Sequence, residues 1–348
     1  MSIYWLMLLI PMVATLHSVK LDINLRMLVF WLVGALLIFI IGLRYEIGGD
    51  WDRYLSVFSY LDSGPFFENF RGRDIGYEFL YWISMRLFDG IYFVNIISAI
   101  IFVIGLIRFC SVMPFPWLAM LVSVPFLIIV VSMGYTRQAA AVGLIMWGLV
   151  DLMKGKRKHF YAFSILAALF HSSAVIMLPI GLLYNAQRAK IIRFLLYFVT
   201  IIFGVYILFQ EIIGHMYYYY ITIKFHNSEG AVMRILMTFS TAIIFFIFRA
   251  RFKKVFQDEK LWLIFSIISI LLLPLAFFYS TFADRIAIYF LPLQLVVLSR
   301  VPVLITSKYN QSLFVVGVVI TYSSALFVWL IFGKHSSFWL PYKNILLM

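Results

Sequence analysis

Four ionisable side chains stand at the ends of apolar runs, where an ionisable group is costly. Arg44 ends one run, and Arg137, in "GYTRQAAA", opens another after a glycine. His171 lies in "FHSSA", and Arg285, in "FADRIAIYF", begins a further run. A charge at membrane depth costs about 2.5–3.5 kcal/mol on insertion scales and marks a candidate functional site. We therefore take these four residues as the starting point for chemistry.

The stretch "RYEIGGDWDRY" (44–54) places more ionisable groups at the same predicted depth. Arginine carries a planar fork that suits bidentate contact with phosphate, and it stays protonated at any working pH. Arg44, Arg53, Arg137 and Arg285 together predict a site for a phosphate or pyrophosphate headgroup carried by a lipid. A nearby carboxylate or imidazole could act as a general base for a hydroxyl acceptor. The candidates for this base are Asp50, Glu46 and His171.

Structural explanations compete with each of these assignments. An arginine at the end of a span often anchors the helix in the interface, which applies to Arg44 and Arg53. Arg285 could form a simple charge pair with Asp284 at a helix start. His171 could be a buried polar residue that only orients a turn, and Glu46 could be a solvated loop charge.

The pair of carboxylates in "DWD" could bind a divalent cation, but two carboxylates alone are a weak metal signal. We expect neither a metal centre nor a cofactor, and a cation at Asp50 and Asp52 is the alternative. The sequence has no P-loop, GxSxG, HExxH or CxxC motif. Nucleotide-binding, serine-hydrolase, zinc-protease and dithiol chemistries therefore have no support.

The elements that hold these residues must lie in a membrane. The chain has 348 residues, of which 64% are hydrophobic and 12% charged, whereas soluble domains carry about a quarter charged residues. So much apolar surface cannot be hidden in its own core, so we expect one polytopic, all-α membrane domain over 1–348. The net charge of +13 comes from short basic clusters between apolar runs, which excludes nucleic-acid binding as its explanation. The single cysteine, Cys110, excludes an internal disulfide.

Apolar runs of about 17–25 residues are long enough to cross the hydrocarbon core. Continuous apolarity without alternation predicts helices and not barrel strands. We predict about ten spans: 3–19, 25–43, 91–109, 117–133, 138–153, 194–213, 231–248, 261–279, 286–305 and 312–332.

Basic clusters predict the orientation of these spans. "KGKRK" (154–158), "QRAKIIR" (187–193) and "RARFKK" (249–254) should all be cytoplasmic under the positive-inside rule. This orientation places the loop 44–90 outside, in the extracytoplasmic space. Within the loop, glycines followed by Asp50 as an N-cap predict one amphipathic helix, and residues 76–88 predict a second.

Residues 159–184 are too few for two full crossings between two cytoplasmic clusters. Two spans need about 40 residues, so we predict a shallow, re-entrant-like helical hairpin that turns near "FHSSA". Irregular backbone at that depth is tolerated inside protein or along a water-filled cavity. His171 would then lie at the tip of the hairpin, beside a cavity.

Five short motifs, taken together and in this order, resemble the EpsG-like family of Wzy-type bacterial polysaccharide polymerases. They are "GLRYEIGGDWDRY", "DIGYEFL", "GYTRQAAAVG", "FHSSAVIMLP" and "DRIAIYF". The resemblance runs from about Leu43 to Tyr289, and "GGD" replaces the "GTD" of many members. The positions that match the family pattern are Arg44, Gly49, Asp50, Tyr54, Arg137, Gln138, His171 and Arg285.

The resemblance implies an enzyme of the bacterial inner membrane whose active site faces outward, towards the periplasm. It would join oligosaccharide repeat units carried on undecaprenyl pyrophosphate, as in O-antigen, capsule or exopolysaccharide assembly. Flippase and chain-length regulator proteins are the partners it implies. On this basis we assign Arg137 and Arg285 to the pyrophosphate, Arg44 to phosphate or to Asp50, and Asp50 as the base with His171 as competitor.

The remaining predicted substrate contacts are Arg53, Tyr54 and Gln138. Two other functions stay open. A flippase of lipid-linked sugars would also have a cationic cavity, but it should show related halves, and the sequence shows none. A transferase of the O-antigen ligase type would use the same donor with another acceptor, and the residues alone do not separate it from a polymerase.

Overall fold

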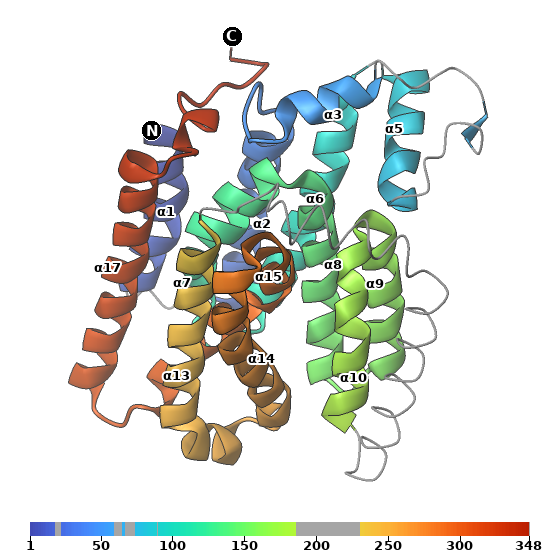
Figure 1. The fold of residues 1–348 in the computed structure, drawn as a ribbon. Helices are drawn as coiled ribbons and strands as arrows, with labels where there is room; N and C mark the ends of the chain where they lie inside the picture. The colour runs from blue at the N-terminus through green and yellow to red at the C-terminus, as the bar shows by residue number, and fades with distance from the viewer. Residues whose placement is uncertain (18–21, 59–64, 67–73, 89, 186–229, 348) are drawn as a thin grey trace.

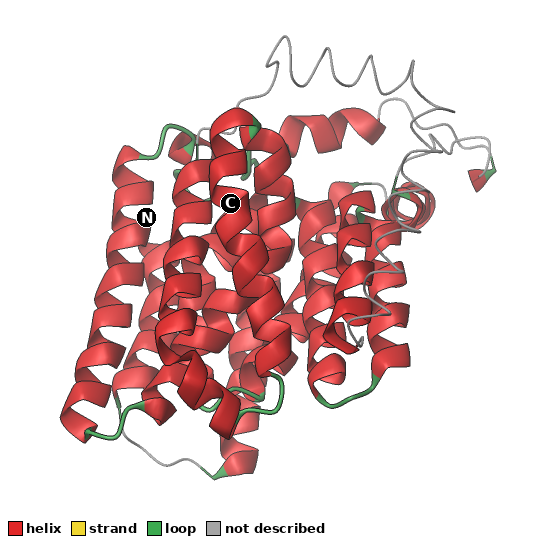
Figure 2. Ribbon diagram, turned by 60° about the horizontal axis from the view of Figure 1, so that its bottom comes forward, coloured by secondary structure: helices red, strands yellow, loops and turns green. Residues whose placement is uncertain are grey.

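The computed structural model describes residues 1–17, 22–58, 65–66, 74–88, 90–185 and 230–347. This part of the chain is helical, with no strand, as Figure 2 shows. The elements are α1 (Ser2–Leu16), α2 (Ile23–Gly42), α3 (Trp51–Phe58), α5 (Ile75–Leu87), α6 (Ile91–Ser111), α7 (Pro116–Ser123), η1 (Val124–Ser132), α8 (Thr136–Met153), α9 (Arg157–Phe170), η2 (Ser172–Met177), α10 (Leu178–Asn185), α13 (Ala231–Val255), α14 (Glu259–Phe278), α15 (Ser280–Ala287), η4 (Ile288–Phe290), α16 (Pro292–Leu304), α17 (Lys308–Phe332) and η5 (Ser336–Phe338).

The all-helical membrane architecture is confirmed. Five helices are long and apolar enough to cross a membrane: α2, α6, α13, α14 and α17. A sixth span results if α15 to α16, bent by 45°, count as one. These helices carry large apolar side chains on their outer surfaces, including Leu32, Ile247 and Leu271, each more than 60% exposed. An apolar surface of this kind is typical of helices that face lipid.

The predicted count of about ten spans is not confirmed. The run 3–19 forms α1, which has 15 residues, and 117–133 forms α7 and the π-helical η1, neither of which reaches the length of a span alone. The run 138–153 forms most of α8, whose side chains are nearly all buried inside the protein. The run 194–213 lies outside the described residues. Hydropathy alone does not separate such interior helices from lipid-facing spans.

Helix α8 is the centre of the bundle and packs between α6 and α9 (Figure 1). Glycines allow α6 and α8 to approach closely. A Cβ atom at Gly143 would lie 2.5 Å from the Cα atom of Phe102, and one at Gly105 would overlap the carbonyl group of Gly143. This backbone-to-backbone contact fixes the position of α8 and hence of the residues at its first turn.

Polar contacts gather at two opposite ends of the bundle. At one end, Arg300 forms a bidentate ion pair with Asp258 (2.7 and 2.9 Å) and reaches the sulfur of Met153 (3.6 Å). Arg251 donates to the carbonyl of Leu304 in the same region (3.1 Å). The basic clusters 154–158 and 249–254 therefore lie at the same end, as predicted, while 187–193 is outside the described residues.

The loop 44–90 lies at the other end, where Figure 1 shows α3 and α5 above the bundle. Both predicted helices of this loop are present, as α3 and α5. The turn that follows α2 contains two residues with a positive φ angle, Glu46 (φ 51°) and Gly48 (φ 105°). A side chain at Gly48 would overlap the carbonyl of Met133, so only glycine lets the loop approach η1 so closely.

Residues 159–184 form a helical hairpin. Helix α9 ends at Phe170, His171 is extended, and the chain returns through the 3-10 helix η2 into α10. Figure 1 shows α9 and α10 side by side next to α8. His171 lies at the turn, as expected, and the depth of this turn in a membrane stays a prediction.

Candidate functional site

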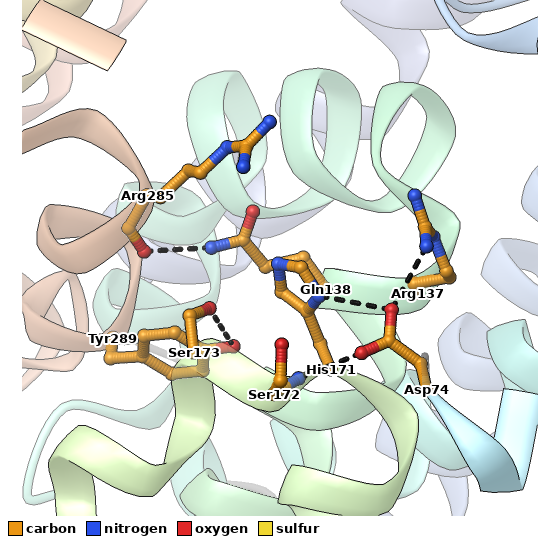
Figure 3. A network of polar contacts seen from close by, with 8 residues as sticks. All are labelled: Asp74, Arg137, Gln138, His171, Ser172, Ser173, Arg285 and Tyr289. Carbon is orange, nitrogen blue, oxygen red and sulfur yellow. Dashed lines mark hydrogen bonds and ion pairs between the residues drawn. The ribbon is translucent and has the colours of Figure 1, made fainter. Parts of the chain in front are cut away.

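The buried carboxylate of Asp74 accepts several of the hydrogen bonds in a polar network at the end of the bundle where the loop 44–90 begins and ends (Figure 3). Its side chain is 5% exposed. One oxygen, Oδ2, accepts from Nη1 of Arg137 (2.9 Å) and lies 3.3 Å from Nδ1 of His171. The other, Oδ1, accepts from the backbone N–H of Ser172 (2.9 Å). Three donors from two separate parts of the chain therefore meet at one carboxylate.

The environment of Asp74 favours its charged form. Burial alone raises the pKa of this carboxyl, because it removes water from the charge. The hydrogen bond and charge of His171, the N–H of Ser172 and the charge of Arg137 outweigh that effect. They hold the pKa of Asp74 below its ordinary value, so the group is a carboxylate at neutral pH.

His171 occupies its position because α9 stops directly before it. The N–H of His171 donates to the carbonyl of Ala167 (2.9 Å), and its extended backbone then directs the chain into η2. With Nδ1 donating to Asp74, the neutral form of the imidazole carries its lone pair on Nε2. Within the described residues, Nε2 of His171 has no hydrogen-bond partner.

Arg137 and Gln138 belong to the first turn of α8, which begins at Thr136. The amide Nε2 of Gln138 donates to the carbonyl oxygen of Arg285 across 2.8 Å, which joins α8 to α15. The guanidinium of Arg137 lies 6.0 Å from the ring centroid of Tyr54, within range of a cation–π contact. Figure 3 shows Arg137 and Arg285 on either side of Gln138 and His171.

The side chain of Arg285 is exposed, and within the described residues its guanidinium has no hydrogen-bond or ion-pair partner. Asp284 does not pair with it. Instead, Asp284 forms a buried bidentate pair with Arg234 of α13, at 2.9 and 2.5 Å. Arg285 is thus left available, while its neighbour fixes α15 to α13. Nearby, the hydroxyls of Ser173 and Tyr289 lie 3.1 Å apart.

The hydrogen bonds of Arg44 lie outside the Asp74 network. Arg44 is 1% exposed, and its guanidinium donates to the carbonyls of Ile41 (2.6 Å) and Ile47 (3.3 Å). It also donates to Oδ1 of Asn95 (3.3 Å) and Oγ1 of Thr136 (2.7 Å). These contacts tie the end of α2 to the first residue of α8. Arg44 therefore forms no hydrogen bond or ion pair with Asp50 or Asp74.

The other predicted residues of the loop take different positions. Asp50 is half-buried at the start of α3, where its carbonyl accepts from the N–H of Tyr54 (3.0 Å), and its carboxylate has no hydrogen-bond or ion-pair partner among the described residues. Tyr54 is buried and Arg53 is exposed. Glu46 points to solvent and pairs with Lys343 (2.5 Å), so it lies on the side of the loop held by the C-terminal segment.

No cluster of three or more His, Cys, Asp or Glu side chains suited to a metal ion occurs within the described residues. Asp52 is exposed and Asp50 half-buried, so these two carboxylates offer no enclosed set of ligands. A cation shared between them stays a prediction. The chemistry that this arrangement supports by itself is binding of an anion by Arg137 and Arg285, with an imidazole nearby.

Two parts of the site are absent from the sequence prediction. Asp74 is one, although "DIGYEFL" is among the motifs quoted above, because its partners Arg137 and His171 lie 63 and 97 residues away. The C-terminal segment is the other. Tyr45 donates to the carbonyl of Lys343 (3.0 Å), and Ile345 donates to that of Leu43 (3.0 Å). This segment lies outside the five motifs quoted above, so none of them indicates it.

Comparison with protein families gives a match to the EpsG family over residues 27–344, nearly the whole chain. The chain belongs to the EpsG family. It is thus a multi-pass membrane protein of the polysaccharide polymerase type, and the resemblance found in the motifs is confirmed. Comparison with curated proteins gave no match, and neither did comparison with solved structures. Every residue of the network in Figure 3 lies inside the matched EpsG segment.

Proposed function

We propose that this EpsG-family protein is a glycosyltransferase that polymerises oligosaccharide repeat units carried on undecaprenyl pyrophosphate. The observation that carries the proposal is the placement of Arg137 and Arg285 on either side of Gln138, at the end of the bundle opposite the basic clusters. Two guanidinium groups at the membrane rim suit a pyrophosphate, whose oxygens accept paired N–H donors. The positive end of the α8 dipole adds to this attraction.

The proposed reaction transfers a glycan from its pyrophosphate carrier to a sugar hydroxyl of a second carrier-linked unit. Charge develops on the leaving pyrophosphate, and fixed cations in a site of low dielectric stabilise that charge. Arg137 and Arg285 take this role. Arg44 supports the first turn of α8 through Thr136. Gln138 and Tyr54 shape the site, and Arg53, at the exposed end of the same loop, contacts the headgroup.

The acceptor hydroxyl must lose its proton as the new bond forms, which requires a base. The candidates are His171, which shares the carboxylate of Asp74 with Arg137, then Asp50 and Glu46. Glu46 is the weakest of them because it is paired with Lys343 on the solvent side. The enzyme would work on the outer face of the bacterial inner membrane, together with a flippase and a chain-length regulator.

Deletion of the gene in its own host tests this function, with surface polysaccharide resolved by gel electrophoresis. We expect single repeat units on the lipid carrier or acceptor in place of long chains, and restoration by the wild-type gene. Loss of all surface glycan, with repeat units trapped inside, would indicate a flippase. Long chains that stay on the carrier, with a bare final acceptor, would indicate a ligase. Either of these two outcomes contradicts the polymerase proposal.

A further inference from the structure

The carboxylate of Asp74 contacts both Arg137, the proposed pyrophosphate ligand, and His171, a candidate general base. Its Oδ2 atom accepts from Arg137 and from His171, at 2.9 and 3.3 Å, and Figure 3 shows it between them. Its Oδ1 atom holds the backbone of Ser172 at the tip of the hairpin. No task in the proposed reaction has yet been given to Asp74.

We propose that Asp74 is a positioning residue that fixes His171 as the general base and Arg137 as a pyrophosphate ligand in one arrangement. The inference rests on the proposed function and deepens it, because it selects His171 over Asp50 as the base. Asp74 acts through these two side chains and does not touch the reacting atoms.

The hydrogen bond between Asp74 and Nδ1 selects the imidazole tautomer. Nδ1 carries the proton that it donates to the carboxylate, so Nε2 presents a lone pair. A buried carboxylate in this position also stabilises the imidazolium that forms when Nε2 takes up a proton, which is the logic of a carboxylate–histidine pair in other enzymes. Asp50 lacks such an arrangement, because its carboxylate has no hydrogen-bond or ion-pair partner among the described residues.

The chemical step transfers one proton to His171 and one electron pair to the leaving pyrophosphate. The oxygen of the acceptor hydroxyl forms a bond to the anomeric carbon of the donor glycan, and its proton moves to Nε2 of His171. The bond between that carbon and the pyrophosphate oxygen breaks, and the electron pair leaves with the pyrophosphate, which Arg137 and Arg285 hold. The imidazolium afterwards gives its proton to water or to the departing pyrophosphate, which restores the neutral base.

Sharing one carboxylate oxygen makes the two tasks interdependent. Arg137 comes from α8 and His171 from the α9–η2 turn, so the Oδ2 atom of Asp74 fixes the distance between a phosphate ligand and the base. Burial strengthens this connection, because water does not compete for the carboxylate. The charged and titratable groups that face His171 from the elements around it are Asp74 before α5, Arg137 on α8, Arg285 on α15 and Tyr289 on η4.

Asp74→Asn tests the inference, with purified full-length protein in lipid nanodiscs. The substrate is the lipid-linked repeat unit extracted from the host strain that lacks this gene. Asparagine at position 74 would bring an amide N–H towards the N–H donors of Arg137 and Ser172. It would also favour the imidazole tautomer whose proton is on Nε2, which leaves no lone pair there to accept the proton of the hydroxyl. We expect kcat to fall by about 10²-fold or more. We also expect the ascending limb of the pH profile of kcat to move to lower pH, because the charge that stabilises protonated His171 is gone.

The shift of the pH profile separates positioning from a merely structural role, because partial unfolding lowers the apparent kcat without moving the limb. Asp22→Asn is the matched control. Asp22 is exposed at the N-terminus of α2, the end of this helix farthest from Arg44. Its side chain caps the helix by accepting from the N–H of Asn24 (3.1 Å), and asparagine caps a helix equally well. We expect wild-type kinetics from this variant.

His171→Asn is the second variant and does not depend on the folding of Asp74→Asn. Its side-chain amide keeps a donor near the position of Nδ1 but takes up no proton. We expect a folded protein whose kcat is lower by about 10²-fold or more. Adding Asp74→Asn to it should lower kcat by less than Asp74→Asn lowers it in the wild type, because only the contact with Arg137 remains to be lost. Unchanged kcat in either single variant, or an unshifted limb in Asp74→Asn, overturns the inference. Wild-type protein that lengthens no glycan overturns the proposed function instead.

Discussion

The Nε2 atom of Gln138 donates a hydrogen bond of 2.8 Å to the carbonyl oxygen of Arg285, although 147 residues separate the two positions. This bond joins the first turn of α8 to α15. Because Arg137 precedes Gln138, the same bond places two arginines from distant parts of the chain on either side of one amide. Arg137 and Arg285 are thus brought to one region of the fold, and their shared contact with one phosphate group stays a prediction.

Arg285→Ala should abolish chain elongation without affecting the fold. Its guanidinium is exposed, so folding does not depend on it, whereas the proposed transition state does. Loss of one charge-stabilising donor costs about 10²–10³-fold in rate, and lysine should restore part of it because it keeps the charge but not the planar fork. The measurement is the rate of elongation in nanodiscs.

Arg157→Ala is the control for this variant. Arg157 is an exposed arginine at the start of α9, at the opposite end of the bundle. We expect its elongation rate to equal that of the wild type. Normal elongation in Arg285→Ala would remove this residue from the proposed pyrophosphate site.

Arg44→Met should destabilise the protein. The substitution keeps much of the apolar stem but leaves the buried carbonyls of Ile41 and Ile47, together with Thr136, without the donor they now have. A lost hydrogen bond to a charged group costs about 1.5–3 kcal/mol. We expect a lower melting temperature in detergent. A variant with wild-type melting but no activity would show instead that Arg44 acts directly on the substrate.

Gly143→Ala and Gly105→Ala should both destabilise the core, because a Cβ atom at either position would overlap the backbone of the neighbouring helix. Overpacking typically costs about 1–3 kcal/mol. Gly317→Ala is the control: it lies within α17, and a Cβ atom there meets nothing within 4 Å. That substitution should be neutral, or stabilising by up to about 1 kcal/mol through helix propensity. Thermal melting of the three variants is the measurement, and equal melting temperatures would contradict the close contact of α6 and α8.

The sequence predicts the fold class and the order of the helices well, because both follow from local signals. Long apolar runs become α2, α6, α13, α14 and α17, and the turn at His171 follows from the short distance between basic clusters. The number of spans is harder to predict, because helices buried inside the protein are as apolar as helices that face lipid. Only packing shows that α8 is enclosed by protein.

Long-range pairing accounts for what the sequence leaves out of the site. Arg137, Gln138, His171 and Arg285 were identifiable because each combines a polar side chain with an apolar run. Asp74 follows a polar loop, where a carboxylate is ordinary, and its role depends on partners that only the folded chain brings to it. Motif recognition covered its segment but could not single it out.

The pair Glu46–Lys343 makes the docking of the C-terminal segment depend on pH. The hydrogen bond from Lys343, followed by that from Tyr45, holds the pKa of Glu46 below its ordinary value of 4.5. The contact to Glu46 in turn raises the pKa of Lys343 above 10.5. Because the pKa of Glu46 is lower in the folded than in the unfolded protein, its ion pair contributes stability when the pH is above the unfolded pKa. This contribution is lost as the pH falls through the folded pKa. For Lys343 the contribution is present below 10.5 and is lost as the pH rises through its folded pKa.

Lys343→Met should therefore loosen the C-terminal segment at about pH 7 but not at a pH below the folded pKa of Glu46, where this carboxyl is protonated in both proteins. Hydrogen exchange of the amides of Tyr45 and Ile345 measures this, because both donate to carbonyls across the junction of the loop and the C-terminal segment. We expect faster exchange than in the wild type at the higher pH and equal exchange at the lower. A difference that persists at the lower pH would show that the aliphatic stem of Lys343, and not its charge, holds the segment, since protonation of Glu46 removes only the electrostatic part.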